Sequence, residues 1–560
     1  MNYNGPMRTI LAIFGCALMA GAQATGPASK APAGTEGWRA VARQFKGGHV
    51  RAHQKFLSGD SLEGRGTGQR GGQVAIDYIA AQFELAGLKP AVNGSYIQPV
   101  PLVGVETDRS STLAVVKDGQ EIRPEYLADY VANNEAQTAV SDVDAAMVFV
   151  GYGIVAPEYQ WDDYKGADLR GKVLLMLVND PPSDDPKLFG GKALTYYGRW
   201  TYKYEEATRR GAAGAVLVHT PQSAGYGWNV VRNSWGREQA YVEVRPGEPA
   251  LKIASWITEA AARRVATLAG QDLDKLTAAA ARRDFRPVDL GVRLRSHLVS
   301  KVRPIRTANV IGVLEGSDPK LKDQAVVYTA HHDHLGVGEP VNGDAIYNGA
   351  VDNASGMGIL LELAWAFAAA PLRPRRSIVF AAVTGEEAGL RGSAYYAAHP
   401  AVPAARTAVD INYDGLSFLG KTRDAQMPGI ERSTLEPIAR QAARALNFRI
   451  VPEEHPEQGY YYRSDHFSLA KVGIPAFTLD LGSDVIGKPP GWGEKQEAEY
   501  RARHYHQPSD EFNPNWDYSA AEQAAAIGIY IGWQAAIAEA LPGWKKGDEF
   551  EAARLKSLGR

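Results

Sequence analysis

Four short apolar runs in the C-terminal half of the chain have the length and composition of buried strands. They are AVVYTA (325–330), SIVFAAV (377–383), TAVDINY (407–413) and IPAFTL (474–479). Between the first two runs, residues 355–370 carry apolar side chains at helical spacing, which predicts one buried helix face. That face comprises Met357, Leu360, Leu361, Ala364 and Phe367. Strands that alternate with helices predict an α/β fold with a mixed, mostly parallel sheet flanked by helices.

The N-terminal half has a different pattern of apolar and polar residues. Residues 74–88 have a helical apolar pattern that ends at Gly87, and a polar Gly-rich loop, SLEGRGTG (61–68), precedes it. From about residue 105 to 290, short β-rich runs are broken by Gly, Pro and Asp. These runs are 145–155, 172–178 and 213–220, with a helix expected at 198–211. Because the ionisable residues of this stretch lack metal-ligand spacing, we expect a non-catalytic module there.

Length and charge narrow the class of protein. A chain of 560 residues is long enough for two or more domains. Its 61 basic and 63 acidic residues leave a formal charge of −2, so we expect no nucleic-acid partner. No run beyond the N-terminal segment is long and apolar enough for a stable membrane span. The sequence carries no signal for the oligomeric state.

The N-terminal segment predicts export. Arg8, the apolar run 10–21 and Ala22-Gln23-Ala24 form the three regions of a secretory signal peptide, residues 1–24, cleaved after Ala24. The apolar run is shorter than the ~20 residues that span a bilayer. A lipoprotein signal at Cys16 is the weaker interpretation, since Phe14 is bulky for that motif. We therefore expect a periplasmic or secreted protein whose mature chain has no cysteine and no disulfide.

Five polar runs in the C-terminal half offer metal-binding side chains. They are AHHDHLG (330–336), NGAVDNASG (348–356), TGEEAG (384–389), INYDG (411–415) and HYHQPSD (504–510). Three of them come directly after predicted strands, where α/β sheets place their sites. Together they supply the histidines, carboxylates and free Glu that a two-metal hydrolytic site needs.

The first two runs predict specific geometry. At a strand end, residues i and i+2 face the same way, so Asp333 can accept the ring N–H of His331 and turn its other nitrogen to a metal. His332 then points away and is structural. Asp352, in a loop that opens a helix, can bridge two cations through its two oxygens. The alternatives are an ordinary buried or surface histidine and, for Asp352, an N-cap or Asx-turn.

The remaining runs supply the other ligands and a base. Adjacent Glu386 and Glu387 repel each other after a buried strand unless cations or a shared proton relieve them. Because neighbouring side chains diverge, Glu387 can bind a metal while Glu386 acts as general base and then acid. The alternative is two solvated loop glutamates.

Asp414 and His506 complete a symmetric arrangement, in which His331 and one carboxylate serve one metal and His506 and another carboxylate serve the second. Nitrogen and oxygen donors without thiolate suit zinc, with cobalt or manganese as substitutes. Tyr505, beside His506, is either a hydroxyl donor to a developing oxyanion or a core aromatic.

The order H-x-D, D, E-E, D, H in these runs resembles the M28 family of dinuclear zinc peptidases, over about residues 309–510. RSDHFSLAKVGIPAF (463–477) also resembles a family segment, to which we assign no catalytic role. The resemblance implies two zinc ions per chain, bridged by Asp352. It implies that the other ligands are His331 and Asp414 on one ion, and Glu387 and His506 on the second. It further implies that Glu386 shuttles the proton, Asp333 orients His331, and Tyr505 assists at the carbonyl.

The β-rich stretch resembles a protease-associated (PA) domain. The likeness lies in FVGYGIVAP (149–157), WDDYKGADLRGKVLLM (161–176) and RRGAAGAVLVH (209–219). It implies a peptidase domain split around an insert. The expected units are an N-terminal part of the peptidase domain (36–104), the PA insert (105–290) and the M28 domain (300–545).

The leading hypothesis is an exported zinc aminopeptidase that hydrolyses N-terminal residues from peptides, through a water bound by two metals and with Glu386 as base. The alternative on the same scaffold is a glutamate-carboxypeptidase-like dipeptidase or carboxypeptidase, which needs cations such as Arg463 for a substrate carboxylate. A binding protein like the transferrin-receptor relatives would have lost the metal ligands that this chain retains. A glutaminyl-cyclase-like acyl transferase would hold one zinc rather than two.

Overall fold

The computed structural model describes residue 34 and residues 36–185, 187–220, 223, 227–453 and 456–560. The predicted signal peptide, its cleavage site after Ala24 and nearly all of the following lead lie outside the described residues. None of the helices in the described ranges combines the length and apolar character that crossing a bilayer would require.

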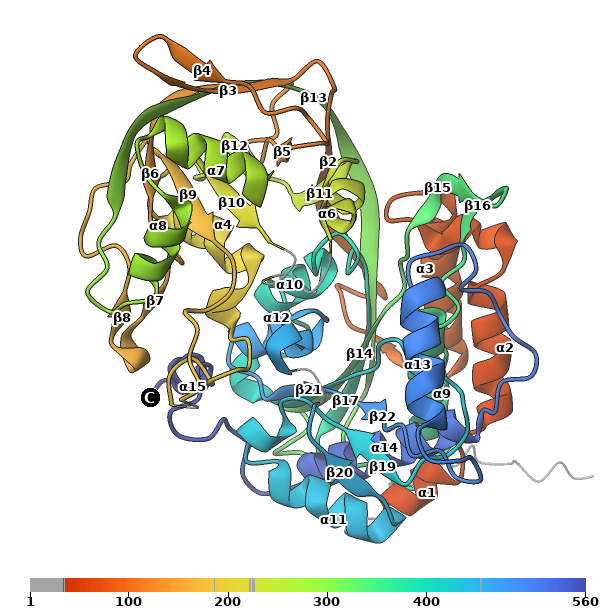
Figure 1. Ribbon diagram of the computed structural model, residues 1–560. Helices are drawn as coiled ribbons and strands as arrows, with labels where there is room; N and C mark the ends of the chain where they lie inside the picture. The colour runs from red at the N-terminus through yellow and green to blue at the C-terminus, as the bar shows by residue number, and fades with distance from the viewer. Residues whose placement is uncertain (1–33, 35, 186, 221–222, 224–226, 454–455) are drawn as a thin grey trace, which may run out of the picture.

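One exceptionally long strand, β13 (Val288–Leu314), joins two lobes of the molecule. Figure 1 shows it running beside both of them. Its C-terminal part pairs with β17 (Ser377–Val383) and β2 (Ile97–Thr107), and its N-terminal part with β3 (Thr112–Lys117) and β6 (Val140–Phe149). We call residues 108–299 the small lobe and the remaining described residues the large lobe.

The large lobe contains the strands that the apolar runs predict. β21 (Ala476–Thr478), β18 (Thr407–Asn412), β14 (Ala325–His331) and β17 lie side by side and run parallel, whereas β13 pairs with β17 antiparallel. Helices cover both faces. The α/β prediction of a mixed, mostly parallel sheet is therefore confirmed.

Alternate residues of each strand face two different cores, as the period of a strand requires. Tyr328 and Phe380 pack with α9 (Ala354–Ala369) and α14 (Ser519–Ile537) on one face. Val327 and Val379 pack with α10 (Arg391–Ala398) and α12 (His466–Lys471) on the other. α9 is buried nearly all round rather than on the one face that its spacing predicts, because α2 (Gly47–Leu57), α3 (Arg70–Leu85) and α14 contact it from outside the sheet.

The N-terminal segment completes the large lobe. α1 (Trp38–Ala42), α2 (Gly47–Leu57) and α3 (Arg70–Leu85) share one continuous core with residues 308–536. α3 begins four residues before the predicted helix and ends as expected, since Gly87 has φ +71° and reverses the chain. The segment that precedes the small lobe in sequence is thus packed beside the segment that follows it.

The small lobe has its own parallel strands and its own cores. β6, β9 (Val173–Leu177), β10 (Gly214–His219) and β12 (Ile253–Thr258) run parallel, and β5 (Tyr130–Asn133) pairs with β12 antiparallel. Two hydrophobic clusters lie on its two faces. The runs predicted at 172–178 and 213–220 correspond to β9 and β10, and the helix predicted at 198–211 to α4 (Trp200–Arg209). The run predicted at 145–155 overlaps only the second half of β6, which ends at Phe149 just before a turn.

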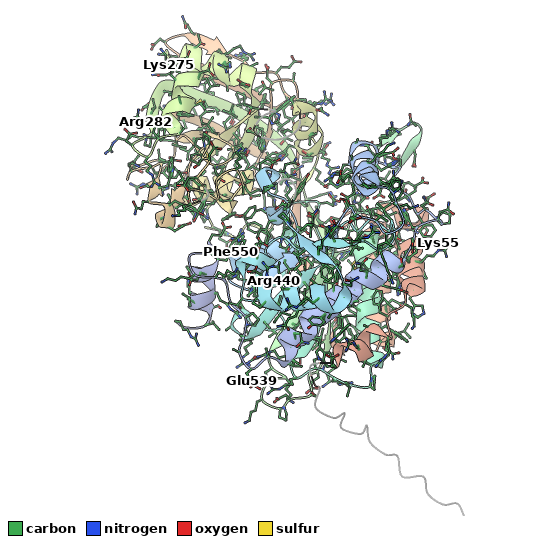
Figure 2. All side chains as sticks on the ribbon, turned by 60° about the horizontal axis from the view of Figure 1, so that its bottom comes forward. Lys55, Lys275, Arg282, Arg440, Glu539 and Phe550 are labelled. Atoms are coloured by element: carbon green, nitrogen blue, oxygen red, sulfur yellow. The ribbon has the colours of Figure 1, made fainter. Side chains whose placement is uncertain are left out.

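The two lobes contact each other beside α12. Tyr196 and Phe467 pack with ring centroids 5.2 Å apart, and Lys471 donates to Glu205 at 2.9 Å. β11 (Gln239–Val242) of the small lobe pairs with β2 of the large lobe. Figure 2 shows the lobes from another side, with Lys275 on one and Lys55 on the other.

Shorter elements complete the described chain. The remaining strands are β1 (Lys89–Pro90), β4 (Gln120–Ile122), β7 (Val155–Ala156), β8 (Trp161–Asp162), β15 (Gly336–Val341), β16 (Asp344–Tyr347), β19 (Asp424–Gln426), β20 (Arg449–Val451) and β22 (Asp480–Leu481). The remaining α-helices in the described ranges are α6 (Trp228–Trp235), α7 (Glu259–Leu268), α8 (Leu273–Ala280), α11 (Glu436–Leu446), α13 (Trp492–Arg503) and α15 (Glu551–Ser557).

Candidate metal centre

Three of the polar runs meet at one edge of the large-lobe sheet. His331 is the last residue of β14, Glu386 and Glu387 follow β17, and Asp414 lies two residues beyond β18. β14 pairs in parallel with both β17 and β18, so the three carboxyl ends lie together. This edge is where parallel α/β sheets build their sites.

The loop before α9 brings Asp352 to the same edge. The helix cap is Asn353, whose side chain accepts the N–H of Gly356 at 2.9 Å. Asp352 is therefore free of the capping role that was its alternative. Its backbone N–H and that of Val351 donate to the Asp510 carboxylate at 3.0–3.2 Å. Asp510, in the fifth polar run, thus holds the Asp352 loop in place.

Each oxygen of Asp352 faces a different histidine. Oδ1 lies 3.3 Å from His331 Nε2, which is also 3.0 Å from Asp414 Oδ1. Oδ2 lies 3.1 Å from His506 Nε2, which is also 3.2 Å from Glu387 Oε2. The five predicted ligands therefore form two groups that share Asp352.

The spacing and chemistry of these donors fit zinc. With zinc–ligand bonds of roughly 2.0–2.1 Å, tetrahedral donors lie about 3.3 Å apart, close to the four distances of the two groups. Burial lowers the pKa of His331, but the charges of Asp414 and Asp352 raise it well above its usual value. His506 shifts the same way because of Glu387 and Asp352. The carboxylates thus favour positive charge at both positions, which is what a cation would supply.

Solvent reaches the site from one side. The side chains of His331, Asp352 and Glu387 are at most 8% exposed, whereas those of Asp414 and His506 are 20% and 34% exposed. His506 follows α13 and has φ +58°, a left-handed backbone that a non-glycine residue rarely adopts. Strained conformations of this kind gather at functional sites.

Asp333 is buried behind His331, but its carboxylate does not make the predicted bond. His331 Nδ1 lies 3.1 Å from the backbone carbonyl of Asp333 and 3.9 Å from its Oδ1. The carboxylate instead accepts from Thr67 Oγ1 at 2.9 Å and from the N–H of Glu386 at 3.2 Å. The backbone turn after β14 brings the carbonyl closer to the ring, so Asp333 orients His331 through its main chain. His332 points away, as predicted, and its Nε2 donates to the Ala308 carbonyl.

Glu386 is the carboxylate that belongs to neither group. In the part of the chain that the structure describes, its side chain makes no hydrogen bond. Burial raises its pKa well above the usual range, and the charges of Asp414 and Glu387 add to the shift against the opposing effect of His331. A carboxyl group whose pKa is raised by its surroundings is suited to accept and return a proton.

Tyr505 lies against the second group of donors. Its ring stacks on His506 with centroids 3.9 Å apart and an interplanar angle of 23°. The side chain is 48% exposed, so the core-aromatic alternative is wrong. Its position beside His506 is compatible with a role at a substrate carbonyl.

Three residues near the site make contacts that the sequence does not reveal, and a fourth is buried there. Arg65, fully buried, donates to the carbonyls of Leu57, His332, Asn348 and Gly349 at 2.5–2.9 Å. Ser464 donates to Asp414 Oδ2 at 2.5 Å, and Asp465 beside it is fully buried. His334 lies 2.6 Å from Glu387. The RSDH motif and the third histidine of AHHDHLG were available signals. Arg65 had none beyond its Gly-rich loop.

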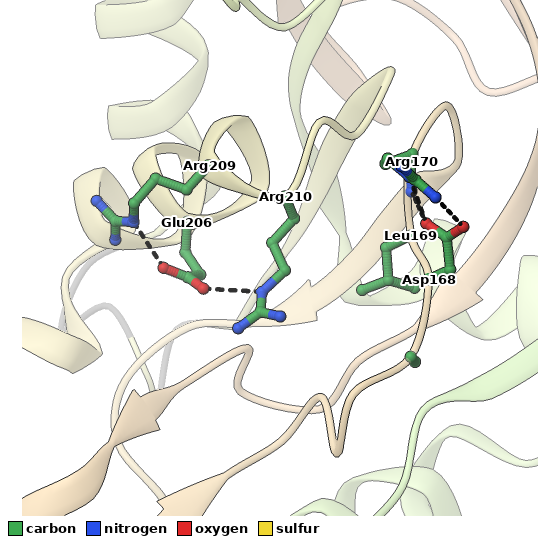
Figure 3. Close-up of a pocket in the computed structure, with 7 residues that line it drawn as sticks. Asp168, Leu169, Arg170, Glu206, Arg209 and Arg210 are labelled. Atoms are coloured by element: carbon green, nitrogen blue, oxygen red, sulfur yellow. Dashed lines mark hydrogen bonds and ion pairs between the residues drawn. The ribbon is translucent and has the colours of Figure 1, made fainter.

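A hollow in the small lobe has no comparable chemistry. It measures about 290 Å³ and lies beside α4. Arg209 and Arg210 both bind Glu206, and Arg170 binds Asp168, as Figure 3 shows. Because its charges are paired with one another, this hollow offers no ligand set.

Comparison with known proteins places the site in context. Residues 309–530 match the model of Peptidase family M28. A probable zinc metalloprotease of Pyricularia oryzae is 43% identical over 95 residues, 17% of this chain and 18% of that protein. Another, from Leptosphaeria maculans, is 39% identical over 94 residues, 17% of this chain and 21% of that protein. The chain thus spans about a fifth of the length of these curated relatives.

The fold extends over more of the chain than the sequence matches do. The solved aminopeptidase from Aneurinibacillus sp. strain AM-1 superposes with a TM-score of 0.50 and 20% identity, covering 90% of this chain and 97% of that one. At this identity the likeness shows the fold alone. The matched family region, 309–530, contains all five predicted ligands and Glu386.

Proposed function

We propose, from the premise that residues 309–530 belong to peptidase family M28, that the protein is a two-zinc aminopeptidase acting on peptides. The observation that carries the proposal is the position of the Asp352 carboxylate between two groups of donors. Each of its two oxygens lies beside a different histidine, and each histidine also lies beside one further carboxylate. One group would hold one ion with His331 and Asp414, and the other a second ion with Glu387 and His506. Bound zinc supplies Lewis acidity, which lowers the pKa of water and polarises a carbonyl.

The proton path runs through Glu386. Its carboxylate accepts the proton of the attacking water and then donates it to the amine that leaves the cleaved peptide bond. Asp333 accepts the N–H of Glu386 and so fixes the start of this side chain relative to His331. Tyr505, stacked on His506, is positioned to donate its hydroxyl to the oxygen of the reacting carbonyl.

A carboxylate beside the site favours a substrate with a free amine. β18 and β21 pair with Asn412 opposite Thr478, so Asp414 and Asp480 both lie two residues beyond the paired ends. Burial raises the pKa of Asp480 to about 8, and the charges of Glu497 and Asp414 contribute. A substrate ammonium would relieve this crowding of negative charge. We therefore propose Asp480 as the group that receives the α-amine.

The carboxypeptidase alternative has one supporting observation. Arg237 of the small lobe lies close enough to lower the pKa of His506 against the raising effect of the carboxylates. A cation there could receive a substrate carboxylate. The small lobe, which we propose to be a PA domain, would then contribute to substrate choice.

Elemental analysis and two substrates test the proposal. We expect two zinc ions per chain, hydrolysis of leucine p-nitroanilide, loss of that activity with a chelator, and its return with zinc. An N-acetylated dipeptide with a free carboxylate serves as the matched substrate. Cleavage of only the acetylated peptide would favour the carboxypeptidase, and the absence of bound metal would favour a binding protein.

Export is a separate proposal. It rests on the N-terminal pattern ending in Ala22-Gln23-Ala24, outside the described residues. N-terminal sequencing of the protein purified from its native compartment should begin at Thr25. An intact N-terminus in the cytoplasm would contradict it.

A further inference from the structure

His334 is a buried histidine that none of the proposed roles uses. It lies three residues after the end of β14, is 2% exposed, and donates its backbone N–H to the Arg65 carbonyl at 3.2 Å. Its ring fills the space next to Gly349, where a Cβ atom would lie 2.5 Å from the imidazole. Gly349 is the start of the loop that carries Asp352. The position of the ring is therefore set by the same loops that build the site.

The ring makes one short polar contact. His334 Nδ1 lies 2.6 Å from Glu387 Oε1 and 4.0 Å from Asp352 Oδ1. Its Nε2 is buried and has no hydrogen-bond partner among the described residues. A neutral imidazole with the proton on Nδ1 satisfies this arrangement, because Nδ1–H then donates to the carboxylate and no N–H is left unpaired at Nε2.

The two oxygens of Glu387 have different partners. Oε1 accepts from His334, and Oε2 lies 3.2 Å from His506 Nε2. Donors that share a zinc ion lie about 3.3 Å apart, whereas the 2.6 Å between His334 Nδ1 and Glu387 Oε1 is the distance of a short hydrogen bond to a carboxylate. His334, Asp352 and Glu387 also lie close enough together to hold an ion. However, the 2.6 Å contact of His334 with Glu387 is shorter than the distance between two ligands of one ion, whereas the 3.2 Å contact of His506 with Glu387 matches it.

We propose that His334 is a positioning residue that holds Glu387 in a one-oxygen binding mode. The hydrogen bond to Oε1 fixes the rotation of the carboxylate, which leaves Oε2 directed to the position that His506 and Asp352 also face. Without it, Glu387 is free to rotate or to offer both oxygens to one ion. The inference rests on the proposed two-zinc function and adds to it a residue that sets the affinity of one of the two ions.

Two amide substitutions of His334 test the roles of its two ring nitrogens separately. In His334→Asn the amide nitrogen reaches the place of Nδ1, and in His334→Gln it reaches the place of Nε2. The measurement is the affinity of each zinc ion in competition with a chromophoric chelator, with stoichiometry from elemental analysis and thermal melting to check folding. Loss of a hydrogen bond to a metal-binding side chain typically costs 10–100-fold in metal affinity.

We expect His334→Asn to retain both affinities within a few fold. His334→Gln should lower the affinity for one zinc ion 10–100-fold and leave the affinity for the other unchanged. His332→Gln is the matched control, because it removes the neighbouring buried imidazole, which contacts Ala308 and none of the proposed ligands. The control should lower the melting temperature without changing either affinity.

Three outcomes would overturn the inference. The Asn and Gln variants would have equal affinities if the Nδ1 bond had no role. Both would saturate at one ion per chain, as His506→Ala should, if His334 were itself a ligand. A wild-type chain that saturates below two ions would overturn the proposed function together with the inference. A wild type with two ions and no peptidase activity would contradict only the reaction.

Discussion

Replacing Glu386 by Gln separates proton transfer from metal binding. The amide has nearly the size of the carboxylate, and the backbone N–H of residue 386 keeps its bond to Asp333. None of the donor distances within the two groups involves Glu386. We therefore expect both zinc ions to remain while turnover falls.

The magnitude follows from the loss of one proton carrier. General acid–base catalysis contributes about 10²–10⁴-fold, and at 1.36 kcal/mol for each factor of ten the barrier should rise by about 2.7–5.4 kcal/mol. The fall should appear in kcat and kcat/KM to the same extent, because the proton moves only in the transition state.

Although Glu386→Gln should lower turnover, it should raise the stability of the folded protein when no metal is bound. Burial and the nearby carboxylates raise the pKa of Glu386, so the folded protein binds this proton more tightly than the unfolded chain and loses stability as pH rises. A neutral amide removes this loss of stability. In the presence of a chelator, the variant should melt at a temperature no lower than the wild type, and zinc should reduce any difference between them.

The assays are steady-state hydrolysis of leucine p-nitroanilide, elemental analysis and thermal melting on the same samples. Loss of one zinc ion together with activity would mean that Glu386 is a ligand. Retention of more than about a tenth of wild-type kcat would mean that another group carries the proton, since the expected loss is at least 10²-fold.

Three further perturbations test the surroundings of the site. Arg65→Met leaves four buried carbonyls without their donor and should lower the free energy of unfolding in urea by about 3–5 kcal/mol, whereas Arg70→Met, at an exposed ion pair, should change it little. Ser464→Ala removes the hydrogen bond to Asp414 and should lower the affinity for one zinc ion about 10–100-fold, as measured in competition with a chelator. An unchanged affinity would contradict this prediction. Burial raises the pKa of Asp465 to about 7, so the folded protein binds its proton more tightly than the unfolded chain and loses stability as pH rises from about 4 to 7. Urea unfolding with a chelator should therefore show Asp465→Asn gaining more over wild type at pH 8 than at pH 5, and an equal difference at both pH values would contradict this.

The small lobe contacts the loop that carries Glu386 and Glu387. Arg391, at the start of α10, donates to the Ala240 carbonyl at 2.8 Å and lies over the Tyr241 ring at 5.1 Å. Its own backbone N–H closes the turn by donating to Gly385. The loop from 385 to 391 is thus packed against β11, so the small lobe supports the turn that presents Glu386 and Glu387.

The sequence by itself determined four strands of the large lobe, three of the small lobe, helices α3, α4 and α9, and the polar runs, because these depend on local periodicity. The long strand β13, which joins the lobes, was not predicted. β14, β17 and β18 are buried along their whole length, mostly by apolar side chains, and a polar run lies at the end of each. Parallel strands place their carboxyl ends at one edge, so His331, Glu387 and Asp414 were predictable as neighbours.

Only the tertiary structure decided how the side chains are used. Asn353 rather than Asp352 caps α9, and the carbonyl of Asp333 rather than its carboxylate meets His331. Arg65 binds the His332 carbonyl across 267 positions of sequence. These choices depend on rotamers, on turn geometry and on contacts between segments far apart in the chain, and local periodicity does not encode any of them. The types of ligand could therefore be predicted from the sequence. Which oxygen of Asp352 or Glu387 faces His331, His334 or His506 could be seen only once the loops were packed together.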